Sequence, residues 1–265
     1  MNYSSAQHTY VLCAYKESSY LEECVKSLFA QTVSSNVLIA TSTPNEHINS
    51  IAQKYGLPVY INEGEKGIGG DWNFAYSQAK TPLITIAHQD DIYEPTYTEE
   101  MLEYINKSKD PIIYFCGYGE YRNGEKVYKN QLLNVKNLML TPLKIKAFWT
   151  SKFIRRRVLA FGCPICCPAV TFVRDRVGEN PFTNDYLSDI DWQQWEIQSR
   201  KKGSFVYNPK PLMCHRIHEE SATTEIIGDS KRSKEDFDMF CKFWPKPIAK
   251  LISKIYSNSE KSNNI

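Results

Sequence analysis

The sequence predicts an α/β fold in which a mostly parallel central sheet is flanked by helices. Along the first third of the chain, short apolar segments alternate with segments whose apolar residues recur at helical spacing. This alternation is typical of parallel strands whose connecting helices cover the faces of the sheet. The 265 residues contain no internal repeat and no low-complexity linker, so we expect one cooperative unit.

The first strand is expected over residues 9–14, and a helix follows it. Ser19 and Glu22 have the spacing of a capping box at the start of this helix. A second strand, a second helix and a third strand are predicted over residues 36–41, 45–55 and 58–61, with Gly56 ending the helix. The apolar face of the first helix would comprise Leu21, Cys24, Val25, Leu28 and Phe29.

A glycine-rich stretch, residues 62–73, leads into a helix that continues to about Ala79. Glycines before a helix N-terminus let backbone N–H groups approach an anionic or nucleotide ligand. Alternatively, the glycines supply turn flexibility and Asp71 is the N-cap of the helix. The spacing matches neither a dinucleotide fingerprint nor a P-loop.

The next strand, within residues 81–95, ends in the adjacent carboxylates Asp90 and Asp91. In open α/β sheets, ligands collect outside the carboxyl ends of the strands. Two oxygen donors at such an end suit Mg²⁺ or Mn²⁺ carrying a diphosphate. The alternative is that the two acids start a solvated turn before Pro95.

The second half of the chain carries another acid pair. Strands are predicted over residues 112–118 and 169–174, a turn at Asn123-Gly124, and irregular or helical structure over 132–154. Asp189 and Asp191 lie at or near the start of a helix that Gly203 stops, and either acid could be only a helix cap. Two short strands, residues 204–207 and 212–214, precede the segment 215–221.

The net charge of +2 favours no class of partner, but its distribution is uneven. No Asp or Glu lies between Glu125 and Asp175. The basic residues of this segment could meet an anionic membrane, a phosphorylated lipid or nucleic acid, or they could form a solvated basic face. No run of 18 apolar residues predicts a membrane span. The basic residues between Glu125 and Asp175 include Lys144, Lys146, Lys152, Arg155, Arg156 and Arg157.

The eight cysteines and the polar N-terminus favour a reducing, cytoplasmic compartment. Cys163 and Cys166 form a CxxC motif, which could bind zinc only with a second pair such as Cys214 and His215. Buried or loop thiols are the simpler interpretation.

In this order, these motifs resemble a family 2 glycosyltransferase of the GT-A fold over about residues 10–224. The segments that carry the resemblance are VLCAYKESSYLEECVKSLFAQT, EKGIGGDWNFA, AHQDDIYEP, DIDWQQW and HRIHEES. The resemblance implies a GT-A domain over residues 1–225, with a donor-binding half of about 1–118 and an acceptor and catalytic half of about 119–225. Residues 226–265 would form a C-terminal helical extension.

The resemblance also implies roles for single residues. Asp91 would ligate a divalent metal, Mn²⁺ or Mg²⁺, and Asp90 would contact the sugar nucleotide or the same metal. Asp191, or failing that Asp189, would be the general base. His218 would complete the metal or diphosphate site, and Arg216 would neutralise phosphate. The donor nucleotide would contact Cys13, Ala14, Tyr15, Glu17, Thr41, Ser42, Gly67, Gly70, Asp71 and Asp90.

Four positions depart from the family pattern. Thr41 and Ser42 replace paired acids that help to bind the nucleobase, so the base is not specified. His88 replaces the leading acid of the DxD-like motif, and Ile190 replaces the usual Glu before Asp191.

The residue types suit sugar transfer from a nucleotide diphosphate. A metal can stabilise the departing diphosphate, and a carboxylate at Asp191 can take the proton of the attacking hydroxyl. No nucleophile signature is present, so a single displacement with inversion is expected. One alternative is a nucleotidyltransferase, which would need a basic loop near the first strand, where only Lys16 is available. Another is a non-catalytic sugar-nucleotide-binding or scaffold protein.

The resemblance implies a glycan or lipid-linked acceptor in cell-surface polysaccharide synthesis and no nucleic-acid partner. Peripheral contact with the inner face of the cell membrane could come from residues 144–157 and 243–256. The second segment has Lys246, Lys250 and Lys254 interspersed among apolar residues, although an ordinary packed helix would explain it equally well. Its apolar face would comprise Ile248, Leu251, Ile252 and Ile255.

Overall fold

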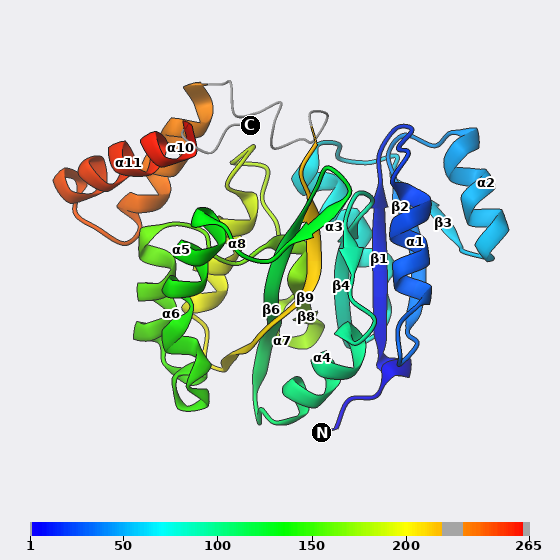
Figure 1. Ribbon diagram of the computed structural model, residues 1–265, viewed down its shortest axis with the longest axis horizontal. Coiled ribbons are helices and arrows are strands. Elements are labelled where there is room, and N and C mark those ends of the chain that lie inside the picture. Colours follow the sequence, from blue (N-terminus) through cyan, green and yellow to red (C-terminus); the bar gives the residue numbers. More distant parts are fainter. Residues whose placement is uncertain (1, 219–229, 262–265) are drawn as a thin grey trace.

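The computed structural model describes residues 2–218 and 230–261 (Figure 1). Within these residues a nine-stranded sheet has the order β3-β2-β1-β4-β8-β6-β9-β5, with β7 paired to β6. The strands are β1 (His8–Ala14), β2 (Asn36–Thr41), β3 (Val59–Ile61), β4 (Leu83–His88), β5 (Ile92–Tyr93), β6 (Pro111–Arg122), β7 (Glu125–Val127), β8 (Val170–Val173) and β9 (Ser204–Arg216).

Most strands of the sheet run in one direction. β3, β2, β1 and β4 are mutually parallel, and β6 is parallel to β9. β8 lies antiparallel between β4 and β6, and the short strands β5 and β7 are antiparallel to β9 and β6. The predicted α/β class with a mostly parallel sheet is therefore confirmed.

Helices cover the sheet and extend beyond it at one end. α3 packs on β1, β2 and β4, and α4 packs on β6 and β9. The α-helices are α1 (Leu21–Phe29), α2 (Glu46–Tyr55), α3 (Ile68–Gln78), α4 (Tyr97–Asn106), α5 (Gln131–Met139), α6 (Lys152–Val158), α7 (Arg174–Val177), α8 (Ile190–Ser199), α10 (Ser230–Cys241) and α11 (Lys246–Lys261). The 3-10 helices are η1 (Ser5–Gln7), η2 (Thr141–Lys144), η3 (Lys146–Thr150), η4 (Leu159–Phe161) and η5 (Cys167–Ala169). Figure 1 shows α5, α6, α10 and α11 together at the end of the molecule opposite α2 and β3.

Local signals predicted several elements correctly. Asn45 caps α2 by accepting a hydrogen bond from the N–H of Ile48, and Gly56 ends the helix with a left-handed φ of 64°. Asn123 and Gly124 have φ values of 51° and 85°, as a tight hairpin turn between β6 and β7 requires. The proposed boundary between donor and acceptor halves, at residue 118, falls inside β6.

The predicted capping box at the start of α1 is wrong. The helix begins at Leu21, whose N–H donates to the carbonyl of Ser18, and no side chain caps it. Glu22 instead accepts hydrogen bonds from Lys54 and Tyr55, because the neighbouring helix α2 offers it a cation. Four of the five predicted apolar positions are buried, and the fifth, Phe29, is 52% exposed.

Asp71 is not the N-cap of α3, because the helix already starts at Ile68 after Gly67. Its carboxylate accepts hydrogen bonds from Ser42 Oγ (2.9 Å) and Asn62 Nδ2 (2.8 Å). Asp71 thus ties the ends of β2 and β3 to the first turn of α3.

The two short strands predicted near the end of the domain are one strand, β9. Pro209 and Pro211 lack an N–H group, which made the segment resemble two strands separated by a break. The pairing with β6 shifts register there and then continues to Arg216. This continuity carries the residues after Leu212 to the carboxyl edge of the sheet. Residues 219–221 of the closing motif lie outside the described part of the chain.

The close packing around Gly70 yields a stability prediction. A Cβ atom on Gly70 would lie 2.5 Å from the carbonyl oxygen of Glu65, a backbone atom that cannot easily move. Gly70→Ala should therefore lower the free energy of unfolding by about 2 kcal/mol, the usual penalty for overpacking. Gly64→Ala is the matched control, since its Cβ would meet only Asn62 Oδ1 at 3.4 Å. Urea unfolding measures both, and equal stability of the two variants would contradict the prediction.

Candidate active site

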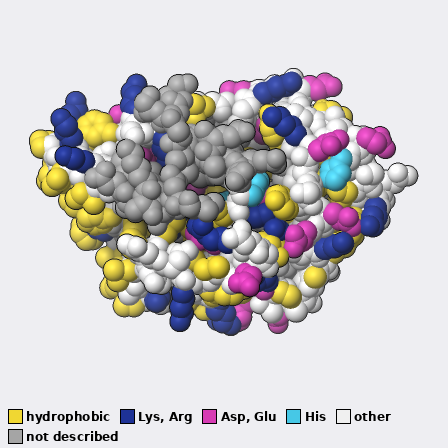
Figure 2. Space-filling model, turned by 45° about the horizontal axis from the view of Figure 1, so that its top comes forward, with side chains coloured by type: hydrophobic (Ala, Val, Ile, Leu, Met, Phe, Trp, Pro, Cys, Tyr) yellow, Lys and Arg dark blue, Asp and Glu magenta, His cyan; other side chains and the backbone are white. Residues whose placement is uncertain are grey.

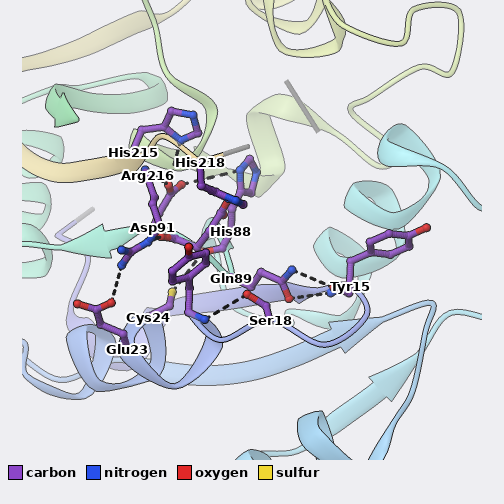
Figure 3. Close-up of polar contacts among 12 residues, drawn as sticks. Tyr15, Ser18, Glu23, Cys24, His88, Gln89, Asp91, His215, Arg216 and His218 are labelled. Carbon is purple, nitrogen blue, oxygen red and sulfur yellow. Dashed lines mark hydrogen bonds and ion pairs between the residues drawn. The ribbon is translucent and has the colours of Figure 1, made fainter. Parts of the chain in front are cut away.

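The acidic end of β4 is fastened to the end of β9 by a buried carboxylate. Asp91 is 0% exposed, and its Oδ1 accepts hydrogen bonds from His215 Nδ1 (2.9 Å) and the N–H of Arg216 (3.1 Å). Figure 3 shows the His215 ring beside Asp91, whereas the side chain of Arg216 is directed at Glu23. Asp91 Oδ2 is buried without a hydrogen-bond partner, 3.9 Å from His88 Nδ1. Asp91 therefore lies beneath the surface of the site.

His215 carries the charge that balances Asp91. Burial alone would lower the pKa of His215, but the charge of Asp91 and its hydrogen bond raise the pKa to about 9. The imidazole is therefore protonated at neutral pH and forms an ion pair with Asp91. His88 differs, because burial lowers its pKa and keeps it neutral.

Asp90 and His218 form a second pair, closer to solvent. His218 Nε2 lies 3.0 Å from Asp90 Oδ2, and the two side chains are 16% and 18% exposed. Burial alone would raise the pKa of Asp90, but the hydrogen bond from His218 and the charge of His215 hold it below the usual value. Asp90 is therefore an ionised carboxylate that a ligand can reach.

Arg216 contacts both the segment after β4 and helix α1. Its Nε donates to the carbonyl of Asp90 (2.8 Å), and its Nη2 lies 2.5 Å from Glu23 Oε2. The guanidinium lies between the rings of Tyr20 and Tyr121, at 4.3 and 4.4 Å from their centroids. Arg216 is 6% exposed, and these contacts join the segment after β4 to the end of β9 and to α1.

The predicted donor residues lie along the same edge of the sheet. In the parallel register, Cys13 is level with His88 and Ala14 is level with Thr41. Ala14, Thr41 and Gly70 are buried, so they lie beneath the edge. Tyr15, Glu17 and Gly67 are exposed, and Cys13, Ser42 and Asp71 are partly exposed.

Two residues that shape this edge were missed by the sequence reasoning. The Gln89 side chain bonds both the N–H and the carbonyl of Tyr15, each at 2.9 Å, and so fixes the loop after β1 (Figure 3). Trp72 of α3 stacks on His88 with a centroid distance of 5.0 Å. Only the position of Gln89 directly after a strand could have indicated its role.

The second acid site is at the start of α8. Asp191 is partly exposed, and its Oδ1 accepts a hydrogen bond from the N–H of Trp192 (2.6 Å). The thiol of Cys163 lies 3.7 Å from Asp191 Oδ2. Burial raises the pKa of Asp191 to about 6, and the charge of Lys136 limits the rise.

Asp189 has a different environment from Asp191. It is 6% exposed, and one carboxylate oxygen has no hydrogen-bond partner. Burial and the nearby Asp236 and Asp191 raise the pKa of Asp189 well above its ordinary value. Asp189 therefore holds its proton more tightly than an ordinary aspartate does.

Lys136 of α5 connects the two acid sites and was not predicted. Its Nζ donates to the hydroxyl of Tyr118 (2.8 Å). The ammonium lies close enough to lower the pKa values of both Asp191 and His215. Cys166 likewise experiences the charges of both Asp91 and Asp191. Lys136 is therefore within electrostatic range of both acid sites.

A separate cleft of about 470 Å³ opens between the glycine-rich loop, α3 and residues 180–184. Of the predicted site residues, only Gly70 lines it. The other lining residues are Asn62, Gly64, Glu65, Asn73, Phe74, Ser77, Asn180, Phe182, Thr183 and Asn184.

In the part of the chain that the structure describes, no group of three or more His, Cys, Asp or Glu side chains has the arrangement of a metal site. Asp90 and His218 nevertheless fit a shared divalent ion, because an ionised carboxylate and an imidazole lie side by side within reach of solvent. A Mn²⁺ or Mg²⁺ ion held by two protein groups commonly takes its other ligands from water and substrate phosphates.

The parallel strands that end in this acid-lined edge, with a further acid facing them from α8, define a glycosyltransferase of the GT-A fold. Residues 9–180 match the family model described as glycosyl transferase family 2, so the chain belongs to that family. The match favours the glycosyltransferase interpretation over the nucleotidyltransferase alternative.

The comparisons also include relatives in Rickettsia and solved structures. An uncharacterized glycosyltransferase of Rickettsia prowazekii is 22% identical over 88% of this chain and 70% of its own length. In three further Rickettsia relatives the chain spans between 31% and 36% of the whole protein.

Two solved structures share the fold. The Pyrobaculum calidifontis mannosyltransferase PcManGT, in complex with GDP-Man and Mn²⁺, has a TM-score of 0.63 at 14% identity, covering 96% of this chain and 70% of its own. S. aureus TarS 1-349, in complex with UDP-GlcNAc, has a TM-score of 0.60 at 13% identity, covering 97% and 73%.

The different environments of the adjacent acids yield a second prediction. Asp91→Ala should lower the free energy of unfolding by about 3 kcal/mol, because it leaves the charged His215 and a buried N–H without their acceptor. Asp90→Ala should lower it by less than about 1 kcal/mol, since His218 can turn to water. Chemical unfolding of both variants provides the measurement. Equal losses would show that Asp91 has no special structural role.

Proposed function

We propose that this protein transfers a sugar from a nucleotide-diphosphate donor to a hydroxyl group of a glycan or lipid-linked acceptor, with inversion and with a divalent metal. The proposal depends most on two distinct acid groups, the Asp90-His218 pair and Asp191, with Lys136 within electrostatic range of both Asp191 and His215. A displacement reaction needs two separate groups, because the leaving group and the attacking hydroxyl occupy opposite sides of the reacting carbon.

Asp90 and His218 would hold the metal, in place of Asp91 and His218. Asp90 is ionised and accessible, whereas Asp91 is 0% exposed and already bonded to His215 and to the backbone. When bound, the metal would neutralise charge on the departing diphosphate. The nucleotide sugars in both solved structures named above, and the Mn²⁺ in one of them, support this assignment.

Asp191 would be the general base. It is partly exposed, and its pKa of about 6 leaves it ionised at neutral pH but more basic than an ordinary aspartate. Asp189 is less suited to this role, because it is 6% exposed and burial raises its pKa well above the ordinary value. Its role would be to shape the start of α8.

The donor nucleotide would lie along the carboxyl ends of β1 and β2, over Cys13, Ser42 and the exposed loop residues Tyr15 and Glu17. Asp71 would act indirectly by fixing Ser42. Cell-surface polysaccharide synthesis is the proposed setting, and the family resemblance supports it.

Replacing the proposed base tests this function. With a panel of UDP- and GDP-sugars and Mn²⁺, the wild-type protein should release nucleoside diphosphate, and Asp191→Asn should lower kcat about 10²–10⁴-fold. Asp189→Asn is the matched control, because it changes an aspartate two residues away, and it should retain most activity. If both variants keep wild-type rates, Asp191 is not the base.

The same assay, run across pH, gives an independent readout of Asp191. The base must be deprotonated, so kcat should fall about tenfold per pH unit below about 6, where Asp191 becomes protonated. A rate that stays constant from pH 7 to about pH 4.5 would contradict the assignment.

A further inference from the structure

Exposed apolar side chains gather at one end of the molecule. Figure 1 places α5, α6 and α11 at this end, and Figure 2 shows hydrophobic side chains along the same edge, with Lys and Arg among them. Of the large apolar side chains exposed in the described residues, most lie in the segments 135–161 and 248–255. These are Val135, Leu138, Ile145, Phe148, Phe153, Phe161, Ile248, Leu251 and Ile255. Together with the exposed lysines Lys144, Lys146, Lys152, Lys246, Lys250 and Lys254, they form a surface that we term the basic apolar face.

Helix α11 carries two apolar stripes, and only one is packed. Ala249 is buried, and Ile252 and Tyr256 pack against the core at helical spacing from it. Leu251 and Ile255, on the other stripe, are each 62% exposed. The helix is thus anchored through one face, and core packing does not explain the second stripe.

The two segments adjoin each other. The ring of Phe161 packs on Trp244, just before α11, at a centroid distance of 5.3 Å. A Cβ atom on Gly162 would lie 2.8 Å from the ring of Tyr256. The exposed apolar residues of η4 and α11 therefore belong to neighbouring parts of one surface.

The two segments that form this face carry charge of one sign. No Asp or Glu occurs between Glu125 and Asp175 or between Asp238 and Glu260. The exposed cations are Lys144, Lys146, Lys152, Lys246, Lys250 and Lys254.

The arginines predicted to contribute to a basic surface are largely internal. Arg155 is 0% exposed and donates to the carbonyls of Gly203 and Lys201. Arg156 pairs with Glu196. Arg155 and Arg156 therefore contribute little to the exposed basic charge, because backbone carbonyls and a buried acid accept their hydrogen bonds.

We propose that the basic apolar face binds the surface of an anionic bilayer. Lysines around exposed aromatic and aliphatic side chains suit a layer with acidic headgroups outside and hydrocarbon beneath. A second copy of the chain is disfavoured, because this face would bring lysines against lysines. Among residues 2–218 and 230–261, no helix is long and apolar enough to cross a bilayer, so attachment through these residues would be peripheral.

Binding to a bilayer does not depend on the proposed reaction, but it would show from which side a lipid-linked acceptor reaches the site. Phe161 lies two residues before Cys163, whose thiol is 3.7 Å from Asp191. An acceptor carried on a lipid in the same bilayer would therefore approach the proposed base from this side. This last step rests on the proposed function.

Vesicle sedimentation tests the proposal on the full chain. The wild-type protein should pellet with vesicles of phosphatidylcholine and phosphatidylglycerol at low salt, and not with phosphatidylcholine alone. Leu251→Ser with Ile255→Ser should weaken binding at least about 10-fold, through lost apolar burial. Replacing Lys246, Lys250 and Lys254 with Gln should weaken it about 100-fold, at roughly 5-fold for each lysine.

The matched control is Ile61→Ser, which removes a 49% exposed apolar side chain at the opposite end of the molecule and should leave binding unchanged. Wild-type protein that stays in the supernatant with anionic vesicles would overturn the proposal, and so would binding that both face variants retain. Dimerisation that the face variants abolish, without vesicle binding, would show that a second copy covers the face. Release of nucleoside diphosphate by the same variants in solution separates this result from the proposed reaction.

Discussion

The site depends on one buried carboxylate, Asp91, held by a charged imidazole and a backbone N–H. Burying an ionised carboxylate is tolerable only when partners replace its hydration, and both partners come from the end of β9. The fold must therefore bring β9 beside β5 and the end of β4. Asp90, which precedes Asp91, and His218, two residues after β9, then lie side by side within reach of solvent.

The pKa values of the two candidate site carboxylates, Asp90 and Asp191, are shifted in opposite directions. Positive and hydrogen-bonding neighbours hold the pKa of Asp90 low, whereas burial raises that of Asp191 to about 6. A permanently ionised group suits a metal, and a group that titrates near neutral pH suits proton transfer. The charge of Lys136 limits how far the pKa of Asp191 rises.

Much of the fold could be predicted from the sequence because local signals decide it. Asn45 and Gly56 bound a helix by their own chemistry, and Asn123-Gly124 specifies a tight turn. Elements decided by tertiary partners were predicted less well. Glu22 pairs with Lys54 instead of capping its helix. The sequence shows two adjacent acids, but only the pairing of β5 with β9 decides that Asp91 is the buried one. Nothing local indicates that Lys136 approaches Asp191.

The most direct test of the account is nucleotide binding by thermal shift, using UDP and GDP with Mn²⁺, Mg²⁺ or a chelator. A ligand at 100 times its Kd should stabilise the protein by about 2.7 kcal/mol. The account predicts that one nucleotide stabilises the wild-type protein only with metal, and that Asp90→Asn and His218→Gln remove this effect without lowering the Tm of the free protein. Metal-dependent stabilisation that survives both substitutions, or that no nucleotide produces in the wild type, would contradict it.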